Sequence, residues 1–313
     1  MRFISFEDAD HRLNWTDMAD ALEAGHRLEK AEIGDLLLAK EDRSLLSRGA
    51  WIDGVGLALK SVTIFPENAT KQPPTPSVQG AMLLFDSESG ALSAILDGPL
   101  VTKWKTAGDS VLGARLLARP DAKSYLVIGA GTVAKTLLQA YSEVFSGLET
   151  LTVWARSTDK AQALVEAMAA EGLTVTVATD LANAVAAADI VSTATLAKEP
   201  ILKGEWVTPG THIDLIGAFR PDMREANDDL MLKGSLFVDA RETTIGEIGE
   251  LMIPMAAGLF DKSHVKGDFR DLCNGAPGRQ SPEEITLFKN GGGAHLDLMT
   301  GDMIVRKVAE EVD

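Results

Sequence analysis

The spacing of hydrophobic and polar residues changes along the chain, and its first part is rich in strand-like runs. These runs lie at residues 56–64, 80–86 and 92–97, after one helical pattern at roughly residues 14–32. Proline, glycine and serine residues separate the runs, as turns between strands require. This part of the chain therefore predicts an antiparallel sheet with one helix.

After residue 120 the pattern becomes an alternation of strands and helices. A helix predicted at residues 106–119 ends at Pro120. Short apolar runs typical of buried strands follow at 124–128, 150–155, 174–178, 190–194, 212–216 and 236–238, with helical patterns at 133–145 and 158–171. This order predicts βαβ units and a parallel sheet.

Together these patterns predict an α/β protein of two domains. Residues 116–290 are expected to form a Rossmann-type domain, with a doubly wound parallel sheet that binds NAD(P). Residues 1–115 with 291–313 are expected to form a smaller α+β domain for substrate binding and dimerisation. The 313 residues exceed what a single hydrophobic core usually organises. Because a small sheet cannot easily bury both faces alone, we expect a homodimer.

The charge balance narrows the classes of partner. The formal net charge of −16 repels nucleic-acid phosphates and anionic lipids, so neither nucleic acid nor a membrane is expected as a partner. The first residues carry acids where a secretory signal needs an apolar stretch, which favours a cytoplasmic location. Cys273 is the single cysteine, and without paired thiols or a histidine cluster no metal site is expected.

A glycine motif stands directly after the predicted strand 124–128 and opens the next helix. It reads Gly129-Ala-Gly131-Thr132-Val133-Ala134. Gly129 permits a tight turn, Gly131 lets a pyrophosphate approach bare backbone, and Ala134 allows the helix to pack closely on the strand. We therefore predict a dinucleotide site at this helix N-terminus, with Thr132 and Val133 beside the two glycines.

The end of the second strand of this domain bears on the choice of dinucleotide. NAD-binding sites usually carry an acid there, which binds the ribose 2′-hydroxyl. This chain has Ala155 instead, followed by Arg156 and Ser157, which suit a 2′-phosphate. NADPH is therefore the expected cofactor. NADH remains the alternative, in which Arg156 is a solvated residue at a strand end.

An ordered series of motifs extends over most of the chain. It consists of Leu59-Lys60 through Phe65-Pro66 to Asn68, Leu84-Phe-Asp86, Asp97-Gly98, Lys105-Thr106-Ala107 with Leu117-Ala-Arg119, the glycine motif, Gly210-Thr-His212, Gly217 and Arg220-Pro-Asp-Met-Arg224-Glu225. The series resembles the ornithine cyclodeaminase and mu-crystallin family, whose members include imine reductases, amino-acid dehydrogenases and cyclodeaminases. The family pairs its small sheets across a two-fold axis, which adds to the case for a homodimer.

Lys60 is the predicted catalytic residue. The family places a lysine from this position beside the nicotinamide and the substrate. Here Lys60 follows the apolar run 55–59, so an inward side chain would be partly desolvated. Desolvation lowers the pKa of a lysine toward values suited to proton transfer. The alternative is an edge-strand lysine that reaches water.

Lys105, Thr106 and Arg48 are the predicted substrate-binding residues. The family usually has Arg-Thr-Ala-Ala where this chain has Lys105-Thr106-Ala107-Gly108, and its arginine binds the substrate carboxylate. Lys105 keeps the charge but loses the bidentate fork, so an anion site of altered geometry is expected, with Thr106 at the start of the following helix. Arg48 is a second candidate carboxylate ligand, and a surface role for it is equally open.

Further positions carry weaker expectations. Thr195, after the strand predicted at 190–194, and Gly292, in the glycine run 291–293 that resembles a family segment near the nicotinamide, are expected to contact the cofactor. The glycines of this run permit close backbone approach. His295 is open between a substrate contact or proton donor, a helix cap and a surface residue.

The resemblance also selects among reactions. Cyclodeaminases carry an aspartate where this chain has Phe219, whereas residues 220–225 resemble the mu-crystallin branch, which reduces ketimines. The expected reaction is NAD(P)H-dependent reduction of a small α-imino acid, such as 1-pyrroline-2-carboxylate, to an L-amino acid. The alternatives are an amino-acid dehydrogenase or acyclic imine reductase of the alanine or iminosuccinate type, and, less favoured, a cyclodeaminase or a binding protein without turnover.

Overall fold

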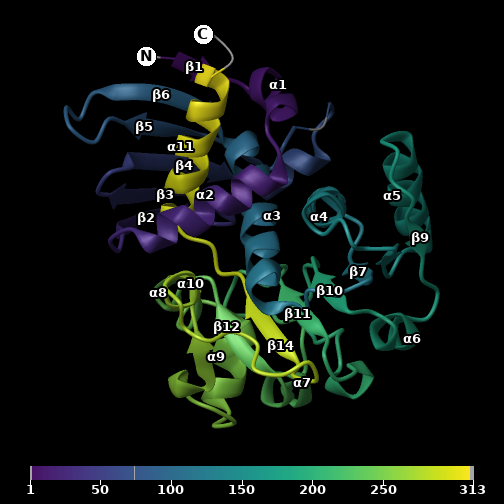
Figure 1. Cartoon of the computed structure of the whole chain (residues 1–313). Helices are drawn as coiled ribbons and strands as arrows, with labels where there is room; N and C mark the ends of the chain where they lie inside the picture. Colours follow the sequence, from purple (N-terminus) through teal and green to yellow (C-terminus); the bar gives the residue numbers. More distant parts are fainter. Residues whose placement is uncertain (1, 74, 311–313) are drawn as a thin grey trace. The chain divides into compact units, whose positions relative to one another are not determined.

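The computed structural model describes residues 2–73 and 75–310, and the chain forms two compact units (Figure 1). Unit 1 is Met1–Thr106 with Gly293–Asp313, and unit 2 is Ala107–Gly292. We expected the first boundary at 115/116, but it falls inside helix α3 (Gly98–Leu117). The difference arises because α3 begins at Gly98, before the predicted start at residue 106, so its first turns belong to unit 1.

Unit 1 contains a six-stranded sheet with the strand order β1-β6-β5-β4-β3-β2. The strands are β1 (Arg2–Ile4), β2 (Glu32–Lys40), β3 (Arg43–Ile52), β4 (Gly56–Ile64), β5 (Val78–Phe85) and β6 (Leu92–Asp97). Neighbouring strands are antiparallel, except that β1 and β6 are parallel. The strands predicted at 56–64 and 92–97 have the predicted bounds.

The expectation of one helix beside this sheet was wrong. The helices of unit 1 are α1 (Phe6–Ala9), α2 (Trp15–Arg27), the first turns of α3 and the C-terminal α11 (Ala294–Glu310), with short 3₁₀ turns at Asp10–Arg12 and Pro66–Thr70. The helix predicted at 14–32 ends earlier, at Arg27. Helix α11 packs along β3, β4 and β5 and against α2, and Figure 1 shows it crossing the strands.

The two faces of the unit 1 sheet differ in cover. Along β4, Ala58 and Lys60 are buried on the face that α11 covers, whereas Leu59 points to the other face and is 38% exposed. Leu36, Leu38 and Trp51 lie on the same outer face by strand register, and 49% to 56% of each is exposed. The outer face is therefore apolar without being covered by the described residues of unit 1.

Unit 2 contains an eight-stranded sheet in which every pair of neighbours is parallel. The order is β13-β12-β14-β11-β10-β7-β8-β9, from β7 (Ser124–Ile128), β8 (Thr150–Trp154), β9 (Thr176–Val177), β10 (Ile190–Thr193), β11 (His212–Leu215), β12 (Ser235–Val238), β13 (Val265–Gly267) and β14 (Thr286–Lys289). The prediction of a Rossmann-type doubly wound sheet is confirmed. β13 and β14 were not predicted.

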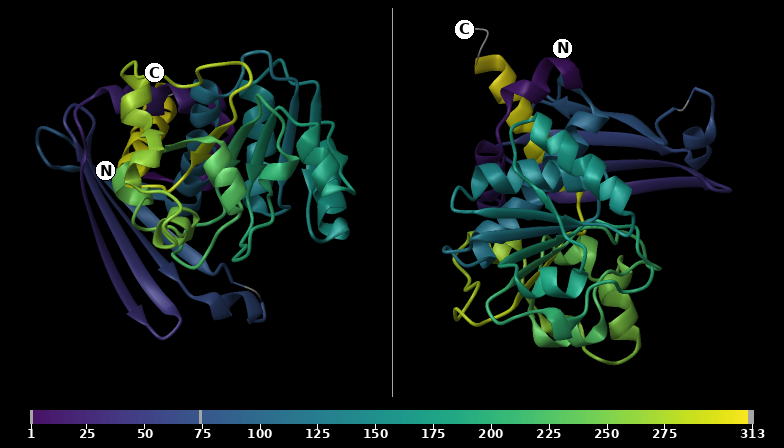
Figure 2. Two further views of the ribbon diagram at one scale, coloured as in Figure 1. Left: turned by 90° about the horizontal axis from the view of Figure 1, so that it is seen from below. Right: turned by 90° about the vertical axis from the view of Figure 1, so that its right-hand side faces the viewer.

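The helices of unit 2 lie on both faces of this sheet (Figure 2). They are α4 (Thr132–Val144), α5 (Thr158–Ala170), α6 (Leu181–Ala186), α7 (Asp228–Lys233), α8 (Arg241–Thr244), α9 (Gly249–Ala256) and α10 (Phe269–Cys273), with the second part of α3. Aliphatic side chains of β7, β10, β11, β12 and β14 pack with those of α6, α7 and α9 in one hydrophobic core cluster. In such a fold, ligands bind at the carboxyl ends of the strands, where the chain crosses from one side of the sheet to the other.

Candidate active site

Lys60 and Asp297 form a buried ion pair within unit 1. Lys60 lies on the covered face of β4, and Asp297 lies in the first turn of α11. The Lys60 Nζ donates a hydrogen bond to Asp297 Oδ1 at 2.5 Å, and the two residues are 8% and 2% exposed. The alternative of an edge-strand lysine in water is therefore wrong. Asp297 was not predicted as a site residue. It could have been proposed from the sequence because it lies in the first helical turn after the glycine run 291–293, a run that was expected to lie near the nicotinamide.

Two further cations act on Lys60. Arg48 of β3 lies directly opposite Lys60 in the β3–β4 register, and Lys105 of α3 is the other charge that acts on it. Burial has the largest effect and lowers the pKa of Lys60; the negative charge of Asp297 raises this pKa, and the positive charges of Lys105 and Arg48 lower it. The net effect is a pKa below the usual lysine value. Lys60 thus holds its proton less tightly than a lysine in water does.

The two cations beside Lys60 differ in how far they are already neutralised. Arg48 is half-buried and binds Asp35 of β2, with Nε and a terminal nitrogen at 2.9 and 2.8 Å from Asp35 Oδ2. Lys105 is half-buried too, and among residues 2–73 and 75–310 no carboxylate forms an ion pair with it. Thr106 lies inside α3 rather than at a helix start, since α3 begins at Gly98. Lys105 is therefore the side chain of this group whose charge remains open to an anion.

Unit 2 has a cavity of about 400 Å³ above the glycine motif. The ends of β7, β8 and β10 and the loops after these strands form the walls of the cavity. The residues that line it are Gly129, Ala130, Gly131, Trp154, Ala155, Arg156, Ser157, Lys160, Ala194, Thr195, Leu196, Ala197 and Ile201. Its volume lies in the range of small-molecule and cofactor sites. Thr132 and Val133 are exposed in the first turn of α4 directly beside it.

The two glycines of the motif serve different needs. Gly129 has φ +132°, and a Cβ there would lie 2.5 Å from the Ala194 carbonyl oxygen, so the fold itself requires glycine. A Cβ on Gly131 would meet nothing within 4 Å, and its φ of −95° is open to any residue. No contact within unit 2 accounts for this second glycine. Bare backbone before the thirteen-residue helix α4 is what the approach of a pyrophosphate requires, so the motif fits a dinucleotide.

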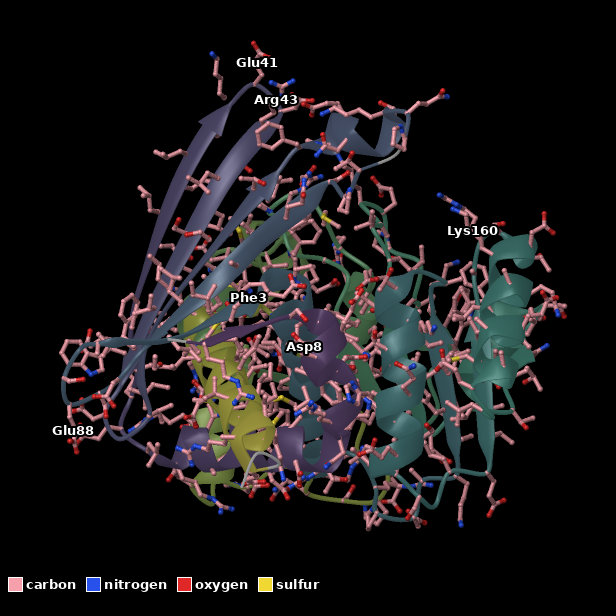
Figure 3. The ribbon with its side chains drawn as sticks, turned by 90° about the horizontal axis from the view of Figure 1, so that it is seen from above. Phe3, Asp8, Glu41, Arg43, Glu88 and Lys160 are labelled. Carbon is pink, nitrogen blue, oxygen red and sulfur yellow. The ribbon has the colours of Figure 1, made fainter. Side chains whose placement is uncertain are left out.

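The edge of the cavity at the end of β8 is positively charged. Arg156, Ser157 and Lys160 are exposed there, and Ala155 occupies the position of the usual ribose-binding acid. Ser157 caps α5, and Lys160 projects from the first turn of that helix (Figure 3). Among the described residues no carboxylate forms an ion pair with Arg156 or Lys160. Lys160 was missed from the sequence, although its place three residues after the cap Ser157 puts it on the same helix end.

Thr195 and Gly292 are held by carboxylates of unit 2. Thr195 lines the cavity, and its amide N–H and its hydroxyl donate to Glu225 Oε1 at 2.8 and 2.7 Å. The amide of Gly292 donates to Asp239 Oδ2 at 2.5 Å. Both backbones are thus fixed, and their donors are occupied by protein groups. Fewer hydrogen-bond donors are therefore open to a ligand in this region than the sequence indicated.

His295, Phe219 and Cys273, which the sequence analysis also considered, differ in their exposure to solvent. His295 is 7% exposed in the first turn of α11 and stands edge-on to His26 at 5.6 Å, so a surface position is wrong for it. Phe219 is 58% exposed. Cys273 is buried at the end of α10. Within residues 2–73 and 75–310 no His, Cys, Asp or Glu side chains cluster as metal ligands.

Among residues 2–73 and 75–310, no helix combines the length and the hydrophobicity that crossing a membrane takes.

The chain is similar to known proteins over nearly its whole length. The model of the Ornithine cyclodeaminase/mu-crystallin family matches residues 38–311. A Delta(1)-pyrroline-2-carboxylate reductase of Paracoccus denitrificans is 53% identical over 309 residues, which cover 98% of this chain and 97% of the relative.

Two solved structures share the fold. A Thermococcus litoralis Delta(1)-pyrroline-2-carboxylate reductase in complex with NADH and L-proline has a TM-score of 0.92 and 30% identity, covering 100% of this chain and 98% of the other. An archaeal alanine dehydrogenase dimer with bound NAD has a TM-score of 0.90 and 26% identity, covering 99% and 97%.

Proposed function

The chain belongs to the ornithine cyclodeaminase/mu-crystallin family, and on that premise we propose that it is an NADPH-dependent reductase of a small cyclic α-imino acid. The substrate class is a ketimine such as 1-pyrroline-2-carboxylate, and the product is the corresponding L-amino acid, L-proline in that case. The relatives named as reductases of this compound support the substrate class. The observation in this chain that carries the proposal is the buried Lys60–Asp297 pair with Lys105 beside it.

The chemistry requires one proton and one hydride at the C=N bond. The bound dinucleotide supplies the hydride, which adds to the imine carbon. Lys60 supplies or relays the proton to the imine nitrogen, so that the electrophile is an iminium ion. A buried lysine with a lowered pKa suits this transfer. Asp297 holds the ammonium group in place through its hydrogen bond.

The substrate carboxylate needs a cation that is not already neutralised. Lys105 meets this requirement, and Arg48 is a second ligand that also holds Asp35. A lysine gives the carboxylate one charged contact without the bidentate geometry of an arginine. Thr106 is the neighbouring hydroxyl on α3 and adds a donor for the same carboxylate.

The cofactor is a nicotinamide dinucleotide, held at Gly129, Gly131, Thr132, Val133 and Thr195, with Gly292 as a further contact. We favour NADPH over NADH. Arg156 and Lys160 are cations at the edge of the cavity that form no ion pair with a carboxylate in the described ranges. Ser157 adds a hydroxyl, and Ala155 leaves no acid to repel a phosphate. The relative from Thermococcus litoralis holds NADH, so this preference belongs to the present chain and needs its own measurement.

The assembly we propose is a homodimer formed through the outer face of the unit 1 sheet. Leu36, Leu38, Trp51 and Leu59 are exposed on that face. An apolar surface of this kind marks an interface in a protein that is otherwise strongly charged. A related archaeal protein is described as a dimer, which supports the same arrangement here.

A substrate panel tests the function. NADPH oxidation is followed with 1-pyrroline-2-carboxylate, its six-membered homologue, pyruvate with ammonia, oxaloacetate with ammonia, and ornithine. The proposal requires the highest kcat/KM with a cyclic imine. Higher kcat/KM with pyruvate or oxaloacetate and ammonia would favour the amino-acid dehydrogenase or acyclic reductase, to which the alanine dehydrogenase likeness points. Binding of NADPH without turnover of any substrate would leave a binding protein.

A further inference from the structure

A cluster of buried charges lies at the carboxyl ends of the unit 2 strands, outside the residues assigned to the reaction. Lys289, the last residue of β14, is wholly buried. Asp214, Glu225, Asp239 and Glu250 are each at most 1% exposed, and the charge of all four acts on Lys289. Burying charges is costly unless each of them is paired or hydrogen-bonded. A fold that keeps five of them in one place therefore gains something other than hydrophobic packing.

Glu225 is the member of this cluster that hydrogen-bonds to a wall residue of the unit 2 cavity. Its Oε1 accepts from the amide and the hydroxyl of Thr195, at 2.8 and 2.7 Å. Its Oε2 accepts from the Thr193 hydroxyl and the Gly217 amide, both at 2.7 Å. The single carboxylate thus fastens the chain after β10 to the chain after β11. Thr195 is a wall residue of the cavity, while Thr193 is wholly buried and does not line it.

The backbone of Glu225 is fixed in turn by Glu250 of α9. The amides of Glu225 and Ala226 donate to the two oxygens of Glu250, at 2.7 and 2.9 Å. Burial and the charge of Glu225 raise the pKa of Glu250 to about 7. Both the side chain and the main chain of Glu225 are therefore held, and the carboxylate cannot turn away from Thr195 without losing several hydrogen bonds.

Lys289 supplies the positive charge for this arrangement without taking an oxygen from Glu225. Its Nζ donates to the carbonyl oxygens of Leu215 and Asn290, at 2.8 and 2.6 Å. Within the described ranges it forms no direct ion pair with a carboxylate. The oxygens of Glu225 thus remain free to accept from Thr193, Thr195 and Gly217, while the nearby cation offsets the cost of their burial.

We propose that Glu225, with Lys289 as its counter-charge, is a positioning residue for dinucleotide binding. Through its four hydrogen bonds it fixes Thr195 and thereby the cavity wall that continues through Leu196 and Ala197. The residue touches no ligand itself and acts through Thr195. This inference rests on the proposed function to the extent that the cavity is taken to hold the dinucleotide.

Two substitutions weaken this unit without altering a side chain of the cavity wall. Glu225→Gln replaces one acceptor oxygen by an amide that faces donors, and Thr193→Val removes one donor at nearly constant volume. The expected effect is a rise in the Kd for NADPH of at least about tenfold for Glu225→Gln and a smaller rise for Thr193→Val, with Thr193→Ser restoring the wild-type Kd. The Kd is measured by titrating the NADPH fluorescence, and the Tm is recorded for each variant.

A control on the same strand as Lys289 separates positioning from stability. Thr286 begins β14, is wholly buried, and hydrogen-bonds through its hydroxyl to His212 and to the Leu117 carbonyl. Thr286→Val should lower the Tm while leaving the Kd for NADPH within about twofold of the wild-type value. The inference is overturned if Glu225→Gln and Thr193→Val lower the Tm but leave the Kd where Thr286→Val leaves it. If Glu225→Gln does not fold, the Thr193 pair decides alone.

The same measurements distinguish this inference from the proposed reaction. A wild-type chain that binds NADPH but reduces no cyclic imine refutes the reaction, and the Kd series still tests the role of Glu225. If NADH binds more tightly, the series is measured with NADH. A wild-type chain that binds neither dinucleotide overturns both.

Discussion

The Lys60 ammonium nitrogen lies 2.5 Å from Asp297 Oδ1, although the two residues are 237 positions apart in the chain. An ion pair buried to this degree gives little net stability, because desolvating the two charges costs about as much as their attraction returns. Replacing such a pair by well-packed hydrophobic residues is often neutral or stabilising. The pair is therefore better explained by chemistry at Lys60 than by folding of unit 1.

Lys60→Met keeps the bulk of the side chain and removes its proton. If Lys60 is the proton donor, kcat on the best cyclic imine should fall by about 10² to 10⁴, the usual contribution of a positioned acid or base. The Kd for NADPH should stay unchanged, since Lys60 is not among the residues that line the dinucleotide cavity. Near wild-type kcat in steady-state assays would leave Lys60 a structural role and direct the search for a proton source to His295.

Lys105→Met tests the carboxylate site. Lys105 is the cation beside Lys60 that pairs with no carboxylate of the described residues. Its loss should raise the KM for the imino acid by about tenfold to a hundredfold, the effect of one charged hydrogen bond, with a smaller change in kcat. Lys105→Arg keeps the charge and should recover most of the affinity. Equal KM values for the methionine and arginine variants would show that the carboxylate is bound elsewhere, with Arg48 as the next candidate.

Arg156→Ala tests the choice of dinucleotide. The wild type should have the higher kcat/KM with NADPH, and Arg156→Ala should lower kcat/KM for NADPH by at least about tenfold while changing that for NADH little. Lys160→Ala should have a smaller effect in the same direction. Lys135→Ala is the matched control, because Lys135 forms an ion pair with Glu171 and does not line the cavity. A wild-type preference for NADH that persists in Arg156→Ala would contradict the assignment.

The outer face of the unit 1 sheet leads to a prediction about assembly. Light scattering at micromolar concentration should give twice the chain mass of 33.4 kDa. Leu36→Lys combined with Leu38→Lys places two charges on that face and should give the monomer mass. Leu232→Lys, which changes an exposed leucine of unit 2, should leave the dimer intact. A wild-type mass near 33.4 kDa would rule the homodimer out.

The sequence predicted best what local chemistry determines. The bounds of β4, β6 and β7 follow from apolar runs that turn residues interrupt, and the glycine motif lies in the predicted strand–turn–helix context. Lys60 and the cation at Lys105 were found through a family resemblance. The burial of Lys60 agrees with strand alternation, because Ala58 and Lys60 lie on the same covered face.

What the sequence did not reveal depends on contacts between distant segments. Asp297 is one of many acids until α11 packs on β4 and brings it to Lys60. β14 was missed because it is a four-residue strand that ends in lysine, a residue normally read as exposed. The buried Lys289 donates hydrogen bonds to two carbonyl oxygens and lies among carboxylates, which together offset the cost of its burial. Apart from Asn290, these partners come from distant parts of the chain, so no local sequence pattern predicts them.

The charge of Asp297 should set the pH dependence of the reaction through its effect on the pKa of Lys60. If Lys60 is the proton donor, it must be in its ammonium form, so kcat should fall as the pH rises through the pKa of Lys60. Burial, Lys105 and Arg48 lower that pKa, and Asp297 raises it. Asp297→Asn keeps the shape of the side chain and removes its charge, so the pKa of Lys60 should fall further and the loss of kcat should begin at a lower pH than in the wild type.

The kcat of both proteins is measured across the pH range at saturating imine and NADPH, with the pKa of the free imine determined separately. The Lys60→Met variant should show no fall of kcat with this midpoint. A merely structural Asp297 would behave differently: Asp297→Asn would then lower kcat by the same factor at every pH and leave the midpoint of the fall where the wild type has it.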